Sequence, residues 1–129
     1  MNKILVEVSV GELLDKISIL EIKKEKIKDS QKLNFINEEY NVLKEQLTNN
    51  IKSDETLEKL FQSLKEINAK LWVIEDDKRM CEKNSDFGEK FIKLSRDVHF
   101  LNDERANIKL KINNHTGSKI KEVKEYTNY

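Results

Sequence analysis

The chain has 129 residues, of which 37% are hydrophobic and 37% charged, and it contains three glycines and no proline. This composition is typical of long helices, and the length fits one domain spanning residues 1–129. Because 24 Lys and Arg residues balance 24 Asp and Glu residues, no net charge would attract nucleic acid or an anionic membrane, and we expect neither partner.

The N-terminal residues predict a short strand followed by a helix. Residues 4–8, "ILVEV", alternate weakly, as a strand does. Ser9 and Glu12 form a capping box, in which each side chain accepts from the backbone amide of the other, and they mark the start of a helix. One apolar stripe of this helix consists of Leu13, Leu14, Ile17, Leu20 and Ile27. Ile19 and Ile22 point the other way, so the helix is either central or shared with a second subunit.

Residues 29–81 predict two helices separated by a polar loop. Asp29 and Ser30 offer a cap for the first, whose apolar residues have the 3-4 spacing of antiparallel bundles and coiled coils. These residues are Leu33, Ile36, Tyr40, Leu43 and Leu47. Ser53 or Asp54 caps the second helix. Its stripe consists of Leu57, Leu60, Leu64, Ile67, Leu71, Ile74 and Cys81.

The last predicted helix covers residues 87–112 and completes a hairpin. Ser85 or Asp86 caps it, and Gly117 suits its C-terminal end. Its stripe consists of Phe87, Phe91, Leu94, Val98, Leu101, Arg105, Ile108 and Ile112. A short link from the preceding helix predicts a long antiparallel hairpin. The tail, residues 119–129, could be a strand paired with residues 4–8 or an extended arm. The predicted fold is therefore an all-α antiparallel bundle of about four helices.

The cysteine and histidine content excludes further kinds of site. The single cysteine, Cys81, excludes an internal disulfide and a thiolate metal cluster, and its place in an apolar repeat predicts a small buried side chain. His99 and His115 match no zinc-ligand spacing. We therefore expect no metal and no cofactor. No run approaches the ~18 apolar residues that span a bilayer, and the apolar run at the amino end is too short for a signal peptide. We therefore expect a cytoplasmic protein.

Charged residues interrupt the helix predicted across residues 57–81. Trp72, Glu75 and Arg79 share one face, roughly 90° from the leucine stripe. An aromatic residue on that face indicates a second neighbour, so Glu75 and Arg79 should be partly covered and could form an i,i+4 pair. Asp77 points away from both faces and should be solvated.

Arg105 lies in the apolar stripe of the last helix, where a buried guanidinium requires a carboxylate partner. Glu21 and Glu75 are the candidates. The first interpretation is a structural ion pair that fixes helix register. The second is a pocket for an anionic or polar ligand, lined by Trp72, Glu75, Arg79, Asn102 and Arg105. The third is an exposed Arg105 at the end of a loose stripe.

Several stretches resemble an uncharacterised family of short, all-helical bacterial and phage proteins. They are "SVGELLDKISILEIK" (9–23), "LWVIEDDKR" (71–79), "DFGEKF" (86–91), "NDERANIK" (102–109) and "GSKIKEVKEY" (117–126). The stretches follow one another over nearly the whole chain. The resemblance implies a helical fold and no established activity, cofactor or catalytic residue.

From these patterns we expect a helical binding or scaffold protein that acts through protein–protein contacts. The two-sided first helix, together with Phe35 and Val42 off the main stripe of the next, favours a homodimer, and a different protein partner is also open. The alternative is a small ligand-binding protein or enzyme with an Arg/carboxylate pocket. No catalytic residue is assigned, and whether the protein is an enzyme stays open.

Overall fold

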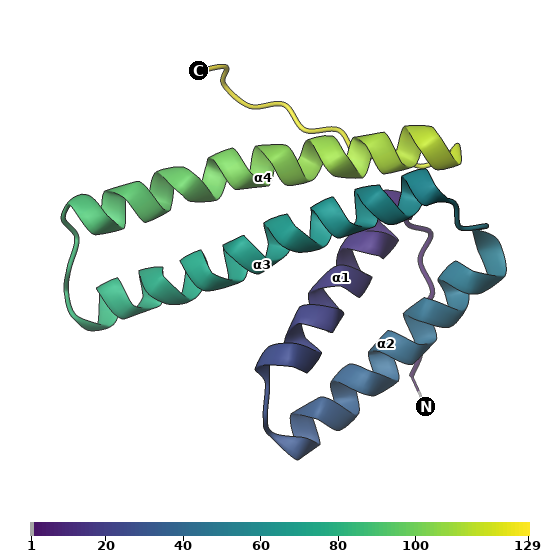
Figure 1. The fold of residues 1–129 in the computed structure, drawn as a ribbon, viewed down its shortest axis with the longest axis horizontal. Coiled ribbons are helices and arrows are strands. Elements are labelled where there is room, and N and C mark those ends of the chain that lie inside the picture. Colours follow the sequence, from purple (N-terminus) through teal and green to yellow (C-terminus); the bar gives the residue numbers. More distant parts are fainter. Residues whose placement is uncertain (1) are drawn as a thin grey trace.

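The computed structural model describes residues 2–129 and arranges them as four helices. These are α1 (Val10–Lys26), α2 (Ser30–Asn50), α3 (Glu55–Lys83) and α4 (Glu89–Thr116). α3 and α4 form a long antiparallel hairpin, α1 packs against each of the other three helices, and α2 packs along α1 (Figure 1). The predicted all-α antiparallel bundle with a long final hairpin is confirmed.

Three of the helices described begin at side-chain caps that the sequence predicts. The Ser9 hydroxyl accepts from the Glu12 amide at 3.1 Å, and Oδ1 atoms of Asp29 and Asp54 accept from amides three residues on, at 2.9 and 2.7 Å. Of the two candidates before α3, Asp54 is thus the cap. The other half of the capping box is wrong, because the Glu12 carboxylate turns to Lys109 Nζ, 2.7 Å away.

The start of α4 differs from the prediction. Neither Ser85 nor Asp86 caps it; the N-cap is Gly88, with no side-chain hydrogen bond. Ser85 adopts a left-handed φ of 53° just after α3 ends, and Asp86 accepts from the Gly88 amide at 3.2 Å, so the loop takes up more residues than expected. Phe87 consequently lies outside the helix and is 53% exposed. Gly117, at φ 67°, ends α4 as predicted.

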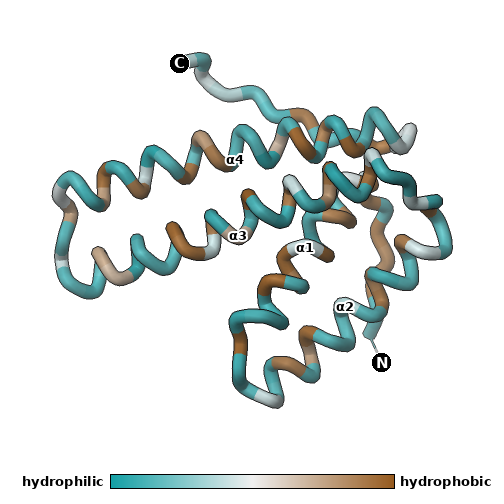
Figure 2. The backbone as a smooth tube through the Cα atoms, viewed as in Figure 1, coloured by the Kyte–Doolittle hydropathy of each residue, from teal (hydrophilic) through white to brown (hydrophobic). Residues whose placement is uncertain are grey.

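The core lies where α1 meets the first half of α3 and the last half of α4. Its buried cluster consists of Leu14, Leu57, Leu64 and Ile112. The C-terminal end of α2 reaches this cluster, where Leu47 and Ile51 pack against it. Both apolar sides of α1 are used, because α1 lies between α2 and the hairpin; Figure 2 shows hydrophobic residues along its whole length. The central position of α1 is therefore enough to explain its two apolar sides, without a second subunit.

The terminal segments do not pair. No strand is present in residues 2–129, so of the two alternatives for the tail, the extended segment is the one observed. The Val10 amide donates to the Ser118 hydroxyl at 3.2 Å, and beyond this point the segments diverge. The tail returns along α4 (Figure 1). Tyr129 there hydrogen-bonds to Asp103 of α4.

The loop end of the hairpin extends beyond α1 and α2 as a two-helix projection (Figure 1). We call residues 73–101 the arm. Cys81 is buried between its helices, as predicted. Five large apolar side chains of the arm are exposed: Val73, Met80, Phe87, Ile92 and Phe100. Two helices cover only one side of each other, so the arm cannot bury all of its apolar surface.

Candidate functional site

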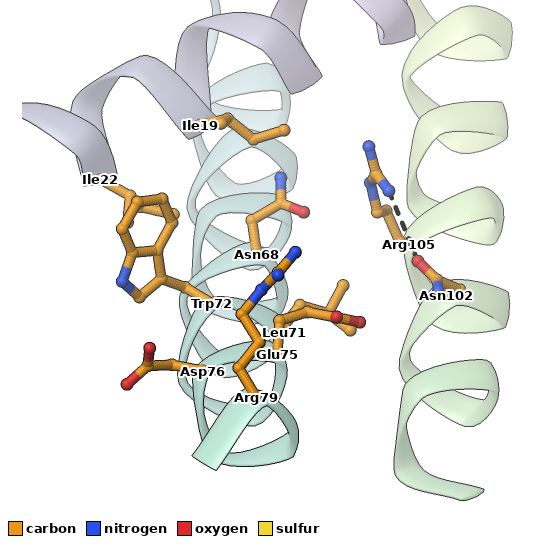
Figure 3. Close-up of a pocket in the computed structure, with 10 residues that line it drawn as sticks. All are labelled: Ile19, Ile22, Asn68, Leu71, Trp72, Glu75, Asp76, Arg79, Asn102 and Arg105. Carbon is orange, nitrogen blue, oxygen red and sulfur yellow. Dashed lines mark hydrogen bonds between the residues drawn. The ribbon is translucent and has the colours of Figure 1, made fainter. Parts of the chain in front are cut away.

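A pocket of about 440 Å³ lies in the notch between the end of α1 and the hairpin (Figure 3). Three helices line it. The lining residues are Ile19 and Ile22 of α1, Asn68, Leu71, Trp72, Glu75, Asp76 and Arg79 of α3, and Asn102 and Arg105 of α4. The structure thus brings together all five residues that the sequence singles out as ligand-binding candidates. Their ligand-binding role stays a prediction.

One face of α3 supplies most of the pocket, because side chains three and four residues apart in a helix lie above one another. Asn68, Trp72, Glu75 and Arg79 follow this spacing. Trp72, the only tryptophan of the chain, is half-buried beside Ile22 of α1, and the Arg79 side chain extends along α3 toward Asn68 (Figure 3).

Next to the pocket, α1 is joined to the hairpin by a buried carboxylate, Asp15, whose side chain is 2% exposed. Arg105 Nε donates to its Oδ1 at 3.0 Å, and Arg105 Nη2 donates to its Oδ2. Asn68 Nδ2 donates to the same carboxylate and to the Ser18 hydroxyl, both at 2.8 Å. Lys109 Nζ lies 3.8 Å from Asp15 Oδ2. Removing either partner of such a buried ion pair strongly destabilises the folded protein, because the other charge stays buried without compensation.

The predicted partners of Arg105 are wrong. Glu21 instead pairs with Lys65 at 3.2 Å and accepts from the Tyr40 hydroxyl at 3.5 Å. Glu75 is exposed and forms no ion pair with any described residue. α1 meets α4 through its first turns, so Asp15, and not Glu21 two turns later, faces Arg105.

Sequence reasoning did not pair Arg105 with Asp15, and it did not place Ser18, Asn68 and Lys109 around that carboxylate. A usable signal exists on α1. The second apolar face of this helix, marked by Ile19 and Ile22, continues backward through Ser18 and Asp15 at helical spacing. A buried aspartate requires a cation opposite it, just as the buried Arg105 requires a carboxylate. The two requirements together point to an Asp15–Arg105 pair.

The ionisation of this network favours its charged form. Burial alone raises the pKa of the Asp15 carboxyl, but hydrogen bonds from Arg105 and Asn68 and the charges of Arg105 and Lys109 hold it below its usual value. Burial likewise acts to lower the pKa of Lys109, but its hydrogen bonds to Glu12 and Glu122 raise it overall. The buried carboxylate and ammonium therefore both stay charged at neutral pH.

Arg105 belongs to the buried network and to the pocket at once. Its Nε and Nη2 atoms face Asp15, whereas Nη1 donates to Asn102 Oδ1 at 3.4 Å on the pocket side (Figure 3). The side chain is 28% exposed, which excludes the fully exposed alternative. Because Asp15 compensates its charge, Arg105 presents the pocket with a hydrogen-bond donor rather than a free cation.

The charged stretch of α3 differs from the prediction in two respects. Glu75 and Arg79 are exposed and do not pair with each other, because they face the open notch rather than a packed helix. Asp77 is half-buried rather than solvated. It lies one turn from both Ile74 and Cys81; the apolar seam of a straight helix drifts around its axis, so the covered side has rotated toward Asp77 here.

A second groove, of about 670 Å³, lies on another face of the hairpin. Its lining residues are Ala69, Lys70, Val73, Ile74, Asp97, Phe100, Leu101 and Glu104. Within residues 2–129, no group of three or more His, Cys, Asp or Glu side chains is arranged to hold a metal ion. No helix in that same range is long and apolar enough to cross a membrane.

Comparison with known proteins identifies the family of the chain. A family of unknown function, DUF6165, matches residues 4–129, so the chain belongs to that family. No curated protein and no solved structure matches it. The family match covers the stretches that carry the resemblance and adds no activity, so function has to be inferred from the pocket.

Proposed function

We propose that this member of the family binds a small polar molecule in the notch pocket, with Trp72, Glu75, Arg79, Asn102 and Arg105 as its ligand contacts. The proposal rests on one observation: polar side chains from two helices line one pocket together with the only tryptophan of the chain. The pocket volume lies within the range of ligand sites, and an apolar lining with a few convergent polar groups is typical of them.

The charges on the α3 side of the pocket support binding over a purely structural role. Within the described chain, Glu75, Asp76 and Arg79 form no ion pair, although all three lie within one turn and line the same pocket. A register-fixing network leaves no such groups unpaired, as the Asp15 cluster shows. Free donors and acceptors beside an indole are suited to a ligand.

Thermal unfolding with a compound panel tests the proposal. The panel contains sugars, amino acids, nucleotides, sugar phosphates and divalent metals, each added to wild type, Arg79→Gln and Asp77→Asn. Asp77 is the matched control, because it lies on α3 but does not line the pocket. We expect one class of compound to raise the melting temperature of wild type and Asp77→Asn, and to raise that of Arg79→Gln less. At a hundredfold excess over Kd, the free energy of unfolding of wild type should rise by about 2.7 kcal/mol. A panel without effect on wild type would refute the proposal.

A second candidate function, a homodimer or partner interface, is supported by the arm. Val73 and Phe100 are 49% and 40% exposed in the second groove, whose rim carries Lys70 on α3 and Asp97 and Glu104 on α4. A second copy packed antiparallel would place opposite charges together in a coiled-coil-like contact. Light scattering of wild type and Val73→Glu tests this: a dimer that the substitution dissociates supports it, and a monomeric wild type rejects the homodimer.

The remaining parts of the proposal come from composition and from the family resemblance. We place the protein in the cytoplasm of a bacterium or a phage-infected cell, without a nucleic-acid partner. No catalytic residue is assigned, because no nucleophile–base pair lines the pocket.

A further inference from the structure

We infer that the ligand is a neutral, polyhydroxylated ring such as a hexose unit, an inference that rests on the proposed function. Charge is the first reason. Asp15 compensates Arg105 through two hydrogen bonds, so the uncompensated groups of the pocket are the carboxylates of Glu75 and Asp76 and the guanidinium of Arg79. With two carboxylates against one cation, the pocket does not favour a phosphate or another multiply charged anion.

The balance of donors and acceptors is the second reason. Arg79, Arg105 Nη1 and Asn102 Nδ2 are donors toward the pocket, while Glu75, Asp76 and Asn68 Oδ1 are acceptors. The Asn102 oxygen accepts from Arg105 and the Asn68 nitrogen donates to Asp15. The remaining amide atoms, Asn102 Nδ2 and Asn68 Oδ1, form no hydrogen bond with any described residue. A hydroxyl group both donates and accepts, so a ring carrying several hydroxyls can satisfy donors and acceptors placed side by side.

The apolar part of the pocket is the third reason. Trp72 is half-buried and shares the lining with Ile19, Ile22 and Leu71. A hexose has hydroxyls around its rim and a C–H face that packs against an indole ring, whose wide surface is rigid and loses little entropy on contact. In Figure 3 the Asp76 carboxylate lies on the same side of α3 as the Trp72 indole, whereas Glu75 points toward α4 and Arg79 lies between them. These groups can therefore reach different hydroxyls of a ring that packs against Trp72.

The indole N–H signal of Trp72 in a ¹⁵N NMR spectrum reports on this pocket alone, because the chain has one tryptophan. The probes are the methyl glycosides of glucose, galactose and mannose, compared with glucose 6-phosphate, inorganic phosphate and phenylalanine. We expect at least one neutral glycoside to shift the signal saturably, and glucose 6-phosphate to bind about tenfold more weakly than that glycoside. Asp76→Asn should weaken glycoside binding about tenfold, because a hydrogen bond to a charged group is lost, whereas Asp77→Asn should leave it unchanged.

The outcomes separate the two proposals. If phosphate, glucose 6-phosphate or phenylalanine shifts the Trp72 signal and no neutral glycoside does, the pocket binds ligands but the neutral ring is wrong. If Asp76→Asn and Asp77→Asn weaken glycoside binding equally, the sugar does not sit where we place it. If no probe shifts the signal and no panel compound stabilises the fold, both the inference and the proposed function fail.

Discussion

The two halves of the α3–α4 hairpin are built alike but covered differently. In the half that carries α1, Leu64 and Ile112 are 0% exposed. In the arm, Ile92 is 55% and Met80 46% exposed, because no third helix lies on it. Packing of apolar side chains therefore depends here on α1 rather than on the hairpin itself, and the pocket lies at the border where this cover ends.

Polar side chains follow the same division. In the covered half Arg105, Asn68 and Lys109 surround Asp15, and no buried side-chain nitrogen or oxygen among residues 2–129 lacks a partner. In the notch, Glu75 and Arg79 have the same chemistry and no ion pair within the described chain. Carboxylate and guanidinium groups thus form ion pairs where a helix covers them and stay unpaired with described residues where none does.

The largest expected effect is that of Asp15→Ala. The substitution leaves Arg105 and Lys109 without their buried carboxylate, and we expect the free energy of unfolding to fall by about 3–5 kcal/mol in urea titrations. Asp97→Ala is the control, because Asp97 pairs with Lys93 on the surface of α4 at 2.8 Å; it should cost less than about 1 kcal/mol. Equal losses would remove the distinction between the two halves.

A truncation in each half compares the two apolar regions directly. Leu64→Ala should lower the free energy of unfolding by about 2–5 kcal/mol, because it opens a cavity in a fully buried cluster. Ile92→Ala in the arm should change it by only about 0.5 kcal/mol. A large effect of Ile92→Ala at high protein concentration alone would indicate that a second copy covers the arm.

Two glycines give a smaller test of the α1–α4 contact. A Cβ at Gly11 would lie 2.6 Å from the Lys109 carbonyl oxygen and 3.0 Å from Asn113 Oδ1, which accepts from the Gly11 amide. Gly11→Ala should therefore cost about 1–3 kcal/mol by forcing the helices apart. A Cβ at Gly88, in the arm, meets nothing closer than Asp86 Oδ1 at 3.6 Å. In thermal unfolding, Gly88→Ala should lower stability less than Gly11→Ala, by up to about 1 kcal/mol, because alanine is a poorer N-cap than glycine.

The smallest expected effect concerns pH. The folded pKa of Asp15 is lowered, so its contribution to stability is present above the unfolded value of about 4 and is lost as the pH falls through the folded pKa. Asp15→Asn should be less stable than wild type at pH 7, and the difference should narrow in urea titrations toward pH 2. A constant difference for Asp15→Asn would mean that its charge contributes nothing.

The sequence predicts this architecture well because its signals are local. Ser9, Asp29 and Asp54 each cap a helix within their own turn, and the apolar stripes have helical spacing. The partner of Arg105 was not predictable in the same way, since it depends on which turn of α1 crosses α4. Asp77 was misplaced because the seam drifts along a 29-residue helix, and the α4 cap because Ser85 takes an uncommon backbone conformation.

Arg105 both holds α1 on the hairpin and lines the pocket. The packing of α1 and the binding of a ligand are therefore coupled equilibria. Asp15 accepts two hydrogen bonds from the Nε/Nη2 edge of the guanidinium, so a ligand that bonds to Nη1 meets a donor already fixed in direction. By thermodynamic linkage, the factor by which a seated α1 strengthens ligand binding is the factor by which bound ligand strengthens the seating of α1. Occupancy of the notch would then be felt as resistance of α1 and α2 to local opening, measurable by hydrogen exchange.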